Sequence, residues 1–465
     1  MGPTILLISG CLLFVLAAIR WREATLLAVF LVLFEGALRK WVFSGGQELV
    51  FFIKDFLLLG AYAGYFFRRN RQGMVRLPHH PANAVLALLA VVCGIQVLNP
   101  RTENLVVALY GVRAYLIYIP LMYVVPSLFP DAASLRRFLA MFLLAALVPL
   151  IVGIAQFGSP ADSVFNRYVG QDEAATVFGA TNKPRISSTF SYISGHTTFL
   201  TVMLLMCFPF VVYARSLRTR LVIVGVLSLT LVNVLMSGSR GPLVIAGGAL
   251  LVFLVSSMSG GVGQFLRTVL TVALVLMVMS WAAVNAFPEA FQAFMDRAVG
   301  SEEEVTQRSV SPVANLPSVI EESGWSGYGI GATNQAARKI EPRSGSAVPG
   351  AENEWDRILL ELGPVGFLLV VIARLQVCGA LWAALRAAGG SESRPLLVGA
   401  FLVSVASLPG NLVFNNTASI GYWFLAGFAF LPAWTDQGET VNAHTEPTRA
   451  CVALVGSPAR NGSAR

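Results

Sequence analysis

Long apolar runs alternate with short polar breaks along most of this chain. The runs lie near residues 4–19, 24–38, 49–67, 82–98, 112–129, 135–157, 196–214, 220–236, 241–257, 265–287, 356–385, 395–413 and 417–434. Many of them pass about 18 residues without a charge, which is the length that an α-helix needs to cross about 30 Å of hydrocarbon. The pattern predicts an all-α, polytopic transmembrane helical bundle of about 12–13 helices.

The composition indicates the same class of protein. Of the 465 residues, 55% are hydrophobic and 12% are charged, and the mean hydropathy is +0.68. Soluble domains carry about 25% charged residues, so the low charge content excludes an ordinary soluble protein. The net charge of +8 does not indicate a nucleic-acid partner, and none is expected. In membrane proteins the basic excess normally lies in cytoplasmic loops.

Basic residues in every second short loop orient the chain. They are Arg20, Arg22, Arg68, Arg69, Arg71, Arg76, Arg136, Arg137, Arg215, Arg218, Arg220, Arg267, Arg386 and Arg394. The positive-inside rule places those loops in the cytoplasm. The loops 158–195 and 288–355 then lie outside. The first run, Ile5 to Ile19, lacks the basic start and the cleavage site of a signal peptide and is predicted to be a retained helix.

The polar interval 288–355 divides the chain, because roughly ten apolar runs precede it and about three follow. The predicted divisions are N-terminal transmembrane helices over 1–134, central transmembrane helices over 135–287 with the short outside loop 158–195, a large extracytoplasmic loop over 288–355, C-terminal transmembrane helices over 356–434, and a disordered cytoplasmic tail over 435–465. We expect the helices to build a cavity and the long loop to cover it.

Several basic residues fall on the outside and not in the cytoplasm. They are Arg39, Lys40, Lys54, Arg101, Arg113, Lys183, Arg185, Arg240, Arg297 and Arg308. An arginine beside a bilayer is costly unless it snorkels or has an anionic partner. Snorkelling or an ion pair explains any one of them. A group that converges on one face indicates an anionic ligand instead, because guanidinium groups fit phosphate oxygens.

Two short motifs place arginines beside helix starts. Arg185 opens Arg-Ile-Ser-Ser-Thr-Phe at the end of the loop 158–195, and His196 follows at the mouth of the next run. His196 is either a packing or capping residue or a base. Arg240 lies in Ser-Gly-Ser-Arg-Gly-Pro, a tight break before another helix. The helix dipole favours anions there, although a plain hairpin is the alternative.

The long loop adds two further stretches. Trp325 lies in the glycine-rich segment 324–331, which is either a turn whose backbone N–H groups face a ligand or a plain flexible loop. Glu352, Asn353, Glu354 and Asp356 cluster at a helix entrance, where the dipole favours carboxylates. They are either capping residues or include a general base for a sugar hydroxyl.

The order of these motifs resembles the bacterial family of O-antigen ligases and O-antigen polymerases, which are membrane glycosyltransferases. The resemblance covers roughly residues 135–430 and runs through Arg185, Arg240, Arg308, Trp325 and the Asn353 motif before Glu-Leu-Gly-x-x-Gly. It implies a GT-C-like bundle in the bacterial cytoplasmic (inner) membrane. It also implies inverting, metal-independent glycosyl transfer, without a cofactor, at the outer face. The donor is a glycan on undecaprenyl pyrophosphate and the acceptor is a glycan or a lipid, in O-antigen (lipopolysaccharide) or exopolysaccharide biosynthesis.

The resemblance also implies roles for individual residues. Arg185, Arg240 and Arg308 would bind the pyrophosphate and stabilise its developing charge, with Arg240 and Arg308 counted among the catalytic residues together with Glu352. Glu352 stands where ligases of the family have a histidine, and a carboxylate is a weak base unless burial raises its pKa from about 4.3. The remaining candidates for substrate binding are Asn353, Trp325 and His196.

Other functions and sites stay open at this point. A transporter or flippase of lipid-linked glycan is one alternative, although the two halves show no convincing repeat of the kind that transporters have. A non-catalytic subunit of a polysaccharide assembly machine is another, because Glu352 replaces the family histidine. The block Phe34–Trp41 with Lys54 and Asp55 either extends the outside cavity or anchors the chain at the interface. No metal site is predicted, since the four histidines are scattered.

Overall fold

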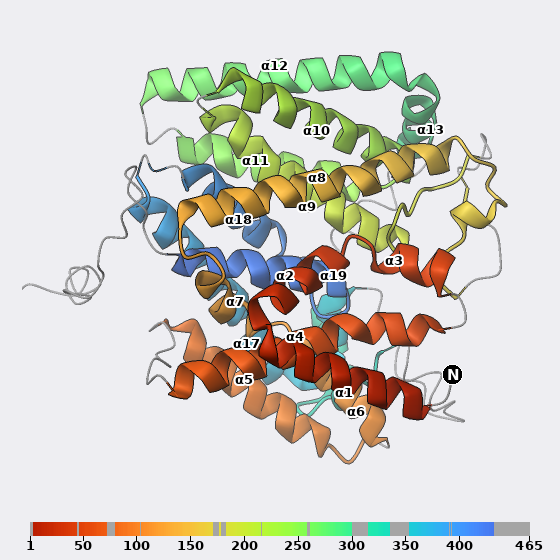
Figure 1. The fold of residues 1–465 in the computed structure, drawn as a ribbon, viewed down its shortest axis with the longest axis vertical. Coiled ribbons are helices and arrows are strands. Elements are labelled where there is room, and N and C mark those ends of the chain that lie inside the picture. Colours follow the sequence, from red (N-terminus) through yellow and green to blue (C-terminus); the bar gives the residue numbers. More distant parts are fainter. Residues whose placement is uncertain are drawn as a thin grey trace, which may run out of the picture.

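The computed structural model describes residues 3–43, 46–71, 80–102, 104–170, 176–177, 183–214, 216–257, 261–299, 315–334, 353–389, 391 and 393–431. These residues form helices that run side by side (Figure 1), and the one β-bridge among them joins Val177 to Pro184. The prediction of an all-α helical bundle is confirmed. Arg308, Glu352 and the tail 435–465 lie outside the described residues.

The chain order of the helices follows the predicted divisions. The N-terminal part contains α1 (Pro3–Ile19), α2 (Trp21–Leu31), α3 (Glu35–Ala37), the π-helical turn η1 (Leu38–Val42), α4 (Gln47–Arg71), α5 (Ala82–Val97), α6 (Leu105–Leu116), α7 (Leu121–Val124) and η3 (Val125–Ser127). The central part contains α8 (Ala132–Phe157), η4 (Val164–Asn166), α9 (Ile193–Tyr213), α10 (Leu217–Ser237), α11 (Gly241–Ser257), α12 (Val262–Ala286) and α13 (Pro288–Val299). The last part contains α15 (Leu316–Ser323), α17 (Glu354–Ala387), α18 (Arg394–Ala406), α19 (Asn416–Ala426) and η6 (Gly427–Phe430).

The lengths of these helices suit a membrane. Among the described residues, six helices are long and apolar enough to span one, namely Gln47–Arg68, Leu105–Ser127, Ala132–Phe157, Ile193–Tyr213, Leu217–Ser237 and Glu354–Ala387. Five shorter apolar helices accompany them, and every predicted apolar run contains a helix. The chain is therefore a multi-pass membrane protein.

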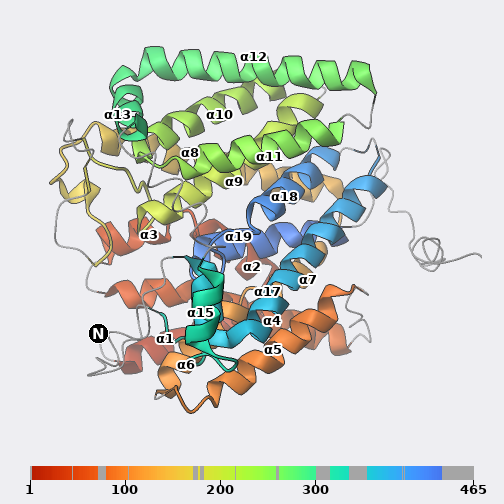
Figure 2. The same cartoon turned by 180° about the vertical axis from the view of Figure 1, so that it is seen from behind.

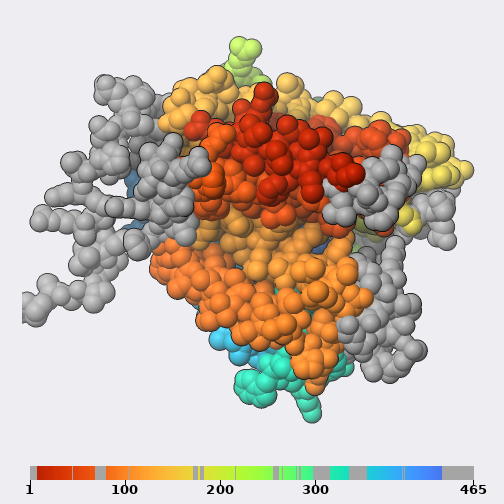
Figure 3. All heavy atoms as spheres, turned by 60° about the horizontal axis from the view of Figure 1, so that its bottom comes forward, coloured from red at the N-terminus to blue at the C-terminus, as the bar shows by residue number. Residues whose placement is uncertain are grey.

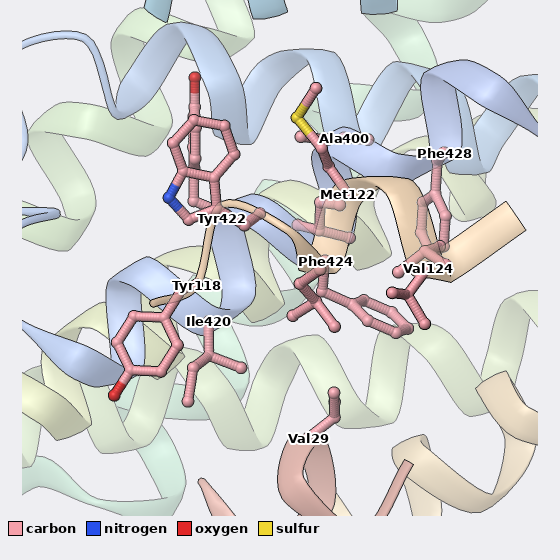
Figure 4. Close-up of a cluster of buried hydrophobic side chains, with 14 of the residues drawn as sticks. Val29, Tyr118, Met122, Val124, Ala400, Ile420, Tyr422, Phe424 and Phe428 are labelled. Atoms are coloured by element: carbon pink, nitrogen blue, oxygen red, sulfur yellow. The ribbon is translucent and has the colours of Figure 1, made fainter. Parts of the chain in front are cut away.

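The bundle has two sides with a shared middle. On one side α4 packs against α1 and α2, and α17 packs against α5; on the other α9 packs against α10 and α11 (Figures 1 and 2). The middle is apolar: Met122 and Val124 of α7 meet Phe424, Phe428 and Ala400 in the largest buried cluster (Figure 4). The N-terminal helices cover part of the outer surface beside α5 and α6 (Figure 3).

The polar interval 288–355 is not a loop throughout. It begins with α13, whose Ala290, Ala293 and Phe294 are buried in one cluster with Ile186 and Met236. This helix has apolar residues on one face only, so it rests on the end of α10 and does not cross the membrane. It places the start of the long interval beside the Arg185 motif.

The glycine-rich turn packs against helices and does not present its backbone to a ligand. Gly331 has a φ of +87°, and a Cβ atom there would lie 2.3 Å from the carbonyl oxygen of Val107 in α6. Gly363 interrupts α17 with a φ of +69°, and a Cβ atom there would lie 2.4 Å from the carbonyl oxygen of Trp325. Only glycine fits such close approaches at positive φ. The turn is thus a fitted connection between α17 and α6, unlike either expected form.

Candidate functional site

A cavity of about 1010 Å³ opens at the end of the bundle that is predicted to face outside. Its walls come from α3, η1, α4, α6, α17, the start of α9, and the loop that leads into α19. The charged, amide and hydroxyl side chains that line it belong to Glu35, Arg39, Glu48, Tyr110, Arg113, Ser191, Tyr192, Ser194, Asn334, Arg357, Asn411, Asn415, Asn416 and Thr417. We call Arg39, Arg113 and Arg357 the cavity arginines.

Arg113 is held from behind by a carboxylate. Its Nε donates to Oδ2 of Asp55 at 2.6 Å, and the hydroxyl of Tyr118 donates to Oδ1 of Asp55 at 2.9 Å. The guanidinium carbon also lies 4.5 Å from the centre of the Phe51 ring. An ion pair and a ring contact together fix the side chain in one orientation, which is what a preorganised binding group needs.

Arg39 is fixed in a similar way from the turn η1. Its Nη1 donates to Oγ of Ser191 at 3.0 Å and lies 3.6 Å from a carboxylate oxygen of Glu35. The other oxygen of Glu35 accepts from Nζ of Lys54 at 2.5 Å, and Lys54 is only 1% exposed. The N-terminal block that the sequence left open between cavity and interface thus contributes Glu35 and Arg39 to the cavity wall.

Arg357 enters the cavity from the first turn of α17. Asn353 caps this helix, because its side chain accepts from the backbone N–H of Asp356 at 2.9 Å and donates to the Asp356 carboxylate at 2.6 Å. The guanidinium carbon of Arg357 lies 5.2 Å from the centre of the Phe414 ring, which also lines the cavity. Capping is therefore what Asn353 does in this structure, and it orients the turn that carries Arg357.

The predicted motifs around Arg185 and Arg240, which we call the motif arginines, also come together. Nε of Arg185 donates to the carbonyl oxygen of Ser237 at 3.0 Å, and the N–H of Ile186 donates to the Met236 carbonyl at 3.4 Å. Arg240 starts α11, because its carbonyl accepts from the N–H of Leu243 at 3.0 Å. Neither motif arginine lines the cavity.

Residues 185–191 connect the two groups of arginines. Within this segment Ser188 has a φ of 51°, and Nζ of Lys40 donates to its carbonyl at 2.5 Å and to Oγ of Ser187 at 3.1 Å. Burial lowers the pKa of Lys40 to about 7. Arg185 stands at one end of the segment and Ser191, the partner of Arg39, at the other. The segment fixes the relative placement of both groups.

Comparison with known proteins identifies part of this region. Residues 225–371 match a family model described as O-antigen ligase. This chain is an O-antigen ligase-like protein. No curated protein and no solved structure matches it. The family is that of O-antigen ligase or polymerase-type membrane glycosyltransferases and implies contact with lipid-linked glycan and membrane lipids. The match includes Arg240 and Arg357 but ends short of Arg39, Arg113 and Arg185.

Other predicted residues of this O-antigen ligase-like chain lie apart from the cavity. His196 is fully buried, and its ring lies 5.6 Å from that of Phe190 and 6.3 Å from that of Phe199. Its place is next to Gly195, which does line the cavity. Trp325 is 84% exposed and is not among the lining residues. The roles of both in substrate binding stay predictions, as do those of Arg308 and Glu352.

The sequence reasoning missed two parts of the cavity. One is Arg357, which stood inside a quoted motif without being counted among the outside basic residues. The other is the loop 407–415 with the start of α19, where Asn411, Asn416 and Thr417 line the cavity. The signal was present, since Asn-Asn-Thr at 415–417 places side-chain amides and a hydroxyl between two apolar runs. In the described part of the chain, no group of three or more metal-ligating residues is found.

Proposed function

We propose that this chain transfers or polymerises undecaprenyl-pyrophosphate-linked glycan at the outer face of the bacterial cytoplasmic membrane, in O-antigen or exopolysaccharide biosynthesis. The observation that carries the proposal is the gathering of arginines at one end of a membrane-spanning bundle, around a cavity of about 1010 Å³. A lipid-linked pyrophosphate needs cations close to the membrane, and its glycan needs a polar cavity beside them. The family match gives the same chemistry in general terms.

The motif arginines and Arg308 carry the leaving group in this proposal. As the bond between the anomeric carbon and the pyrophosphate oxygen breaks, negative charge grows on the pyrophosphate, and guanidinium groups stabilise it. This removes the need for a metal ion. The contact between Arg185 and the Ser237 carbonyl supports a shared role, because it brings the first motif against the loop that carries Arg240.

Glu352 is the proposed base. It accepts the proton of the acceptor hydroxyl while that oxygen attacks the anomeric carbon from the side opposite to the pyrophosphate, which inverts the configuration. Asn353, the next residue, caps α17 and so ties this position to the turn that bears Arg357. Glu352→Gln is expected to lower turnover more than donor binding.

The direct test uses purified protein in detergent with an undecaprenyl-pyrophosphate oligosaccharide and candidate acceptors. Release of undecaprenyl pyrophosphate is measured for the wild type and for Arg308→Ala. Release that depends on the acceptor and disappears in the variant supports the proposal, and the product size then separates polymerase from ligase. Binding of the donor without release would point to transport or assembly, and normal release by Arg308→Ala would remove that residue from the mechanism.

A further inference from the structure

We propose that the cavity is the binding site for the acceptor glycan and that it selects acceptors carrying negative charge, such as the carboxylate of a uronic acid or a phosphate ester. This inference rests on the proposed glycosyl transfer and adds a substrate class to it. The cavity has two unlike walls, one formed by the cavity arginines and one formed by amide and hydroxyl groups. An acidic sugar presents both kinds of matching group.

The arginine wall keeps donors available for a ligand. Arg113 uses Nε and Nη2 in its bonds to Asp55 and Tyr118, which leaves Nη1. Arg39 uses Nη1 for Ser191 and Glu35, which leaves Nη2. A guanidinium has five N–H groups in a fixed plane, so two or three of them can be held by the protein while the others bind a carboxylate or phosphate.

The charges around the cavity favour an anion. Of the two lining carboxylates, Glu35 is paired with the buried Lys54, so it does not cancel the charge of Arg39. Glu48 is exposed at the N-terminus of α4, a position that the helix dipole already favours for a carboxylate. With the paired residues behind the wall included, basic side chains outnumber acidic ones: Arg39, Lys54, Arg113 and Arg357 against Glu35, Glu48 and Asp55.

The opposite wall suits the neutral part of a sugar. Asn411, Asn416 and Thr417 line it, and their side chains make no hydrogen bond to another described residue. Amides donate and accept, as sugar hydroxyls do, so each can satisfy both sides of such a contact. The rings of Phe414 and Tyr110 lie in the same lining and offer apolar surface to the faces of a sugar ring.

A buried ion pair fixes the loop that carries this wall. Glu354 and Arg374, each 4% exposed, contact each other inside α17. Arg374 donates to the carbonyls of Leu408 at 3.0 Å and Gly410 at 3.2 Å, and Glu354 accepts from the N–H of Val413 at 2.7 Å. Buried charges are costly in a membrane protein, so a pair spent on the backbone of one loop indicates that the loop's shape serves function.

A second carboxylate of α17 does the same for the other loop. Glu361, fully buried, accepts from the N–H of Thr333 at 2.9 Å and from its hydroxyl at 2.7 Å. Asn334, the next residue, lines the cavity. Both loops of the neutral wall are therefore positioned by one helix, and such preorganisation lowers the entropy that ligand binding must overcome.

Size and separation point to the acceptor and not to the leaving group. Small-molecule pockets have volumes of about 300–1,000 Å³, so a cavity of about 1010 Å³ has room for more than one sugar ring. The motif arginines do not line it. The pyrophosphate of the donor is assigned to them, which leaves the cavity arginines for a different anion.

The test measures binding to the full chain in detergent, without donor, by isothermal titration calorimetry. The probes are a glucuronic-acid-containing tetrasaccharide, its neutral methyl ester, and the same ester carrying one phosphate. The wild type is expected to bind both anionic probes roughly tenfold tighter than the ester. Arg39→Gln and Arg357→Gln are expected to lose most of this preference, whereas Arg167→Gln, an exposed arginine outside the cavity, keeps it.

A fourth variant separates the two walls. Asn411→Ala is expected to weaken all three probes by a similar factor and to leave the preference for charge intact. Loss of preference in Arg357→Gln with an unchanged melting temperature supports the site, whereas equal affinity for acid and ester, or no binding of any probe, overturns it. Release of undecaprenyl pyrophosphate is followed in parallel, so failure of the proposed transfer is visible separately from failure of acceptor selection.

Discussion

The motif arginines and the cavity arginines occupy the same end of the bundle but are assembled differently. Arg185 and Arg240 belong to short local motifs, and they meet because one loop lies against the end of α10. Arg39, Arg113 and Arg357 come from η1, α6 and α17 and meet only in the folded bundle. The first group is held by backbone carbonyls and the second by carboxylates and aromatic rings.

This difference indicates different ligands. Guanidinium groups held by backbone carbonyls keep their full charge, as a pyrophosphate leaving group requires. Guanidinium groups paired with carboxylates such as Asp55 and Glu35 have a reduced net charge and a fixed direction, which suits recognition of one anionic group among many neutral hydroxyls. The O-antigen ligase match contains one member of each group, Arg240 and Arg357.

The largest expected effect comes from breaking the ion pair under the cavity. Arg374→Met leaves Glu354 buried without its partner, and removal of one member of such a pair destabilises a protein by about 3–5 kcal/mol. The melting temperature in detergent should fall sharply, and the double variant Glu354→Gln/Arg374→Met should recover part of the loss. Arg386→Met, exposed on the same helix, is the control. A single variant as stable as this control would show that the pair does not support the loop.

A smaller effect is expected from Lys40, which lies between the two groups. Its pKa is about 7 in the folded protein against an ordinary 10.5, so between these values the unfolded chain binds a proton that the folded chain does not. Stability should therefore rise with pH across this window, by at most about 1.4 kcal/mol per pH unit. Melting temperatures of wild type and Lys40→Met at pH 6.5, 8 and 9.5 measure it. Parallel pH curves for the two proteins would contradict the assignment.

The fold was largely predictable because its signal is local. An apolar run of membrane length forms a helix wherever it lies, and each predicted run contains one. The ends were less predictable. The run 112–129 divides into α6 and α7 at Pro120, and the run 395–413 stops being helical at Ala406, where Arg374 binds the loop carbonyls. The helix α13 was missed because its apolar face is narrow and lies in a polar interval.

The candidate site was predictable only in part, for a physical reason. Arg39 and Arg113 were recognised as unusual on the outside, but each taken alone fits snorkelling or an ion pair equally well. Their convergence depends on the packing of Gly36 against the backbone at Phe190, where a Cβ atom would lie 2.2 Å away. No sequence spacing encodes that contact. Arg308 and Glu352 lie outside the described residues, so their roles rest on the proposal alone.

The most direct measurement of the division between the two groups is steady-state kinetics with the acceptor varied at saturating donor. Arg240→Ala is expected to lower kcat by roughly 10²–10³-fold and to leave the acceptor KM nearly unchanged, because it removes charge stabilisation in the transition state. Arg39→Gln is expected to raise the acceptor KM and to leave kcat nearly unchanged. If Arg39→Gln instead lowers kcat as Arg240→Ala does, with no change in KM, the cavity arginines take part in the chemistry and the division is wrong.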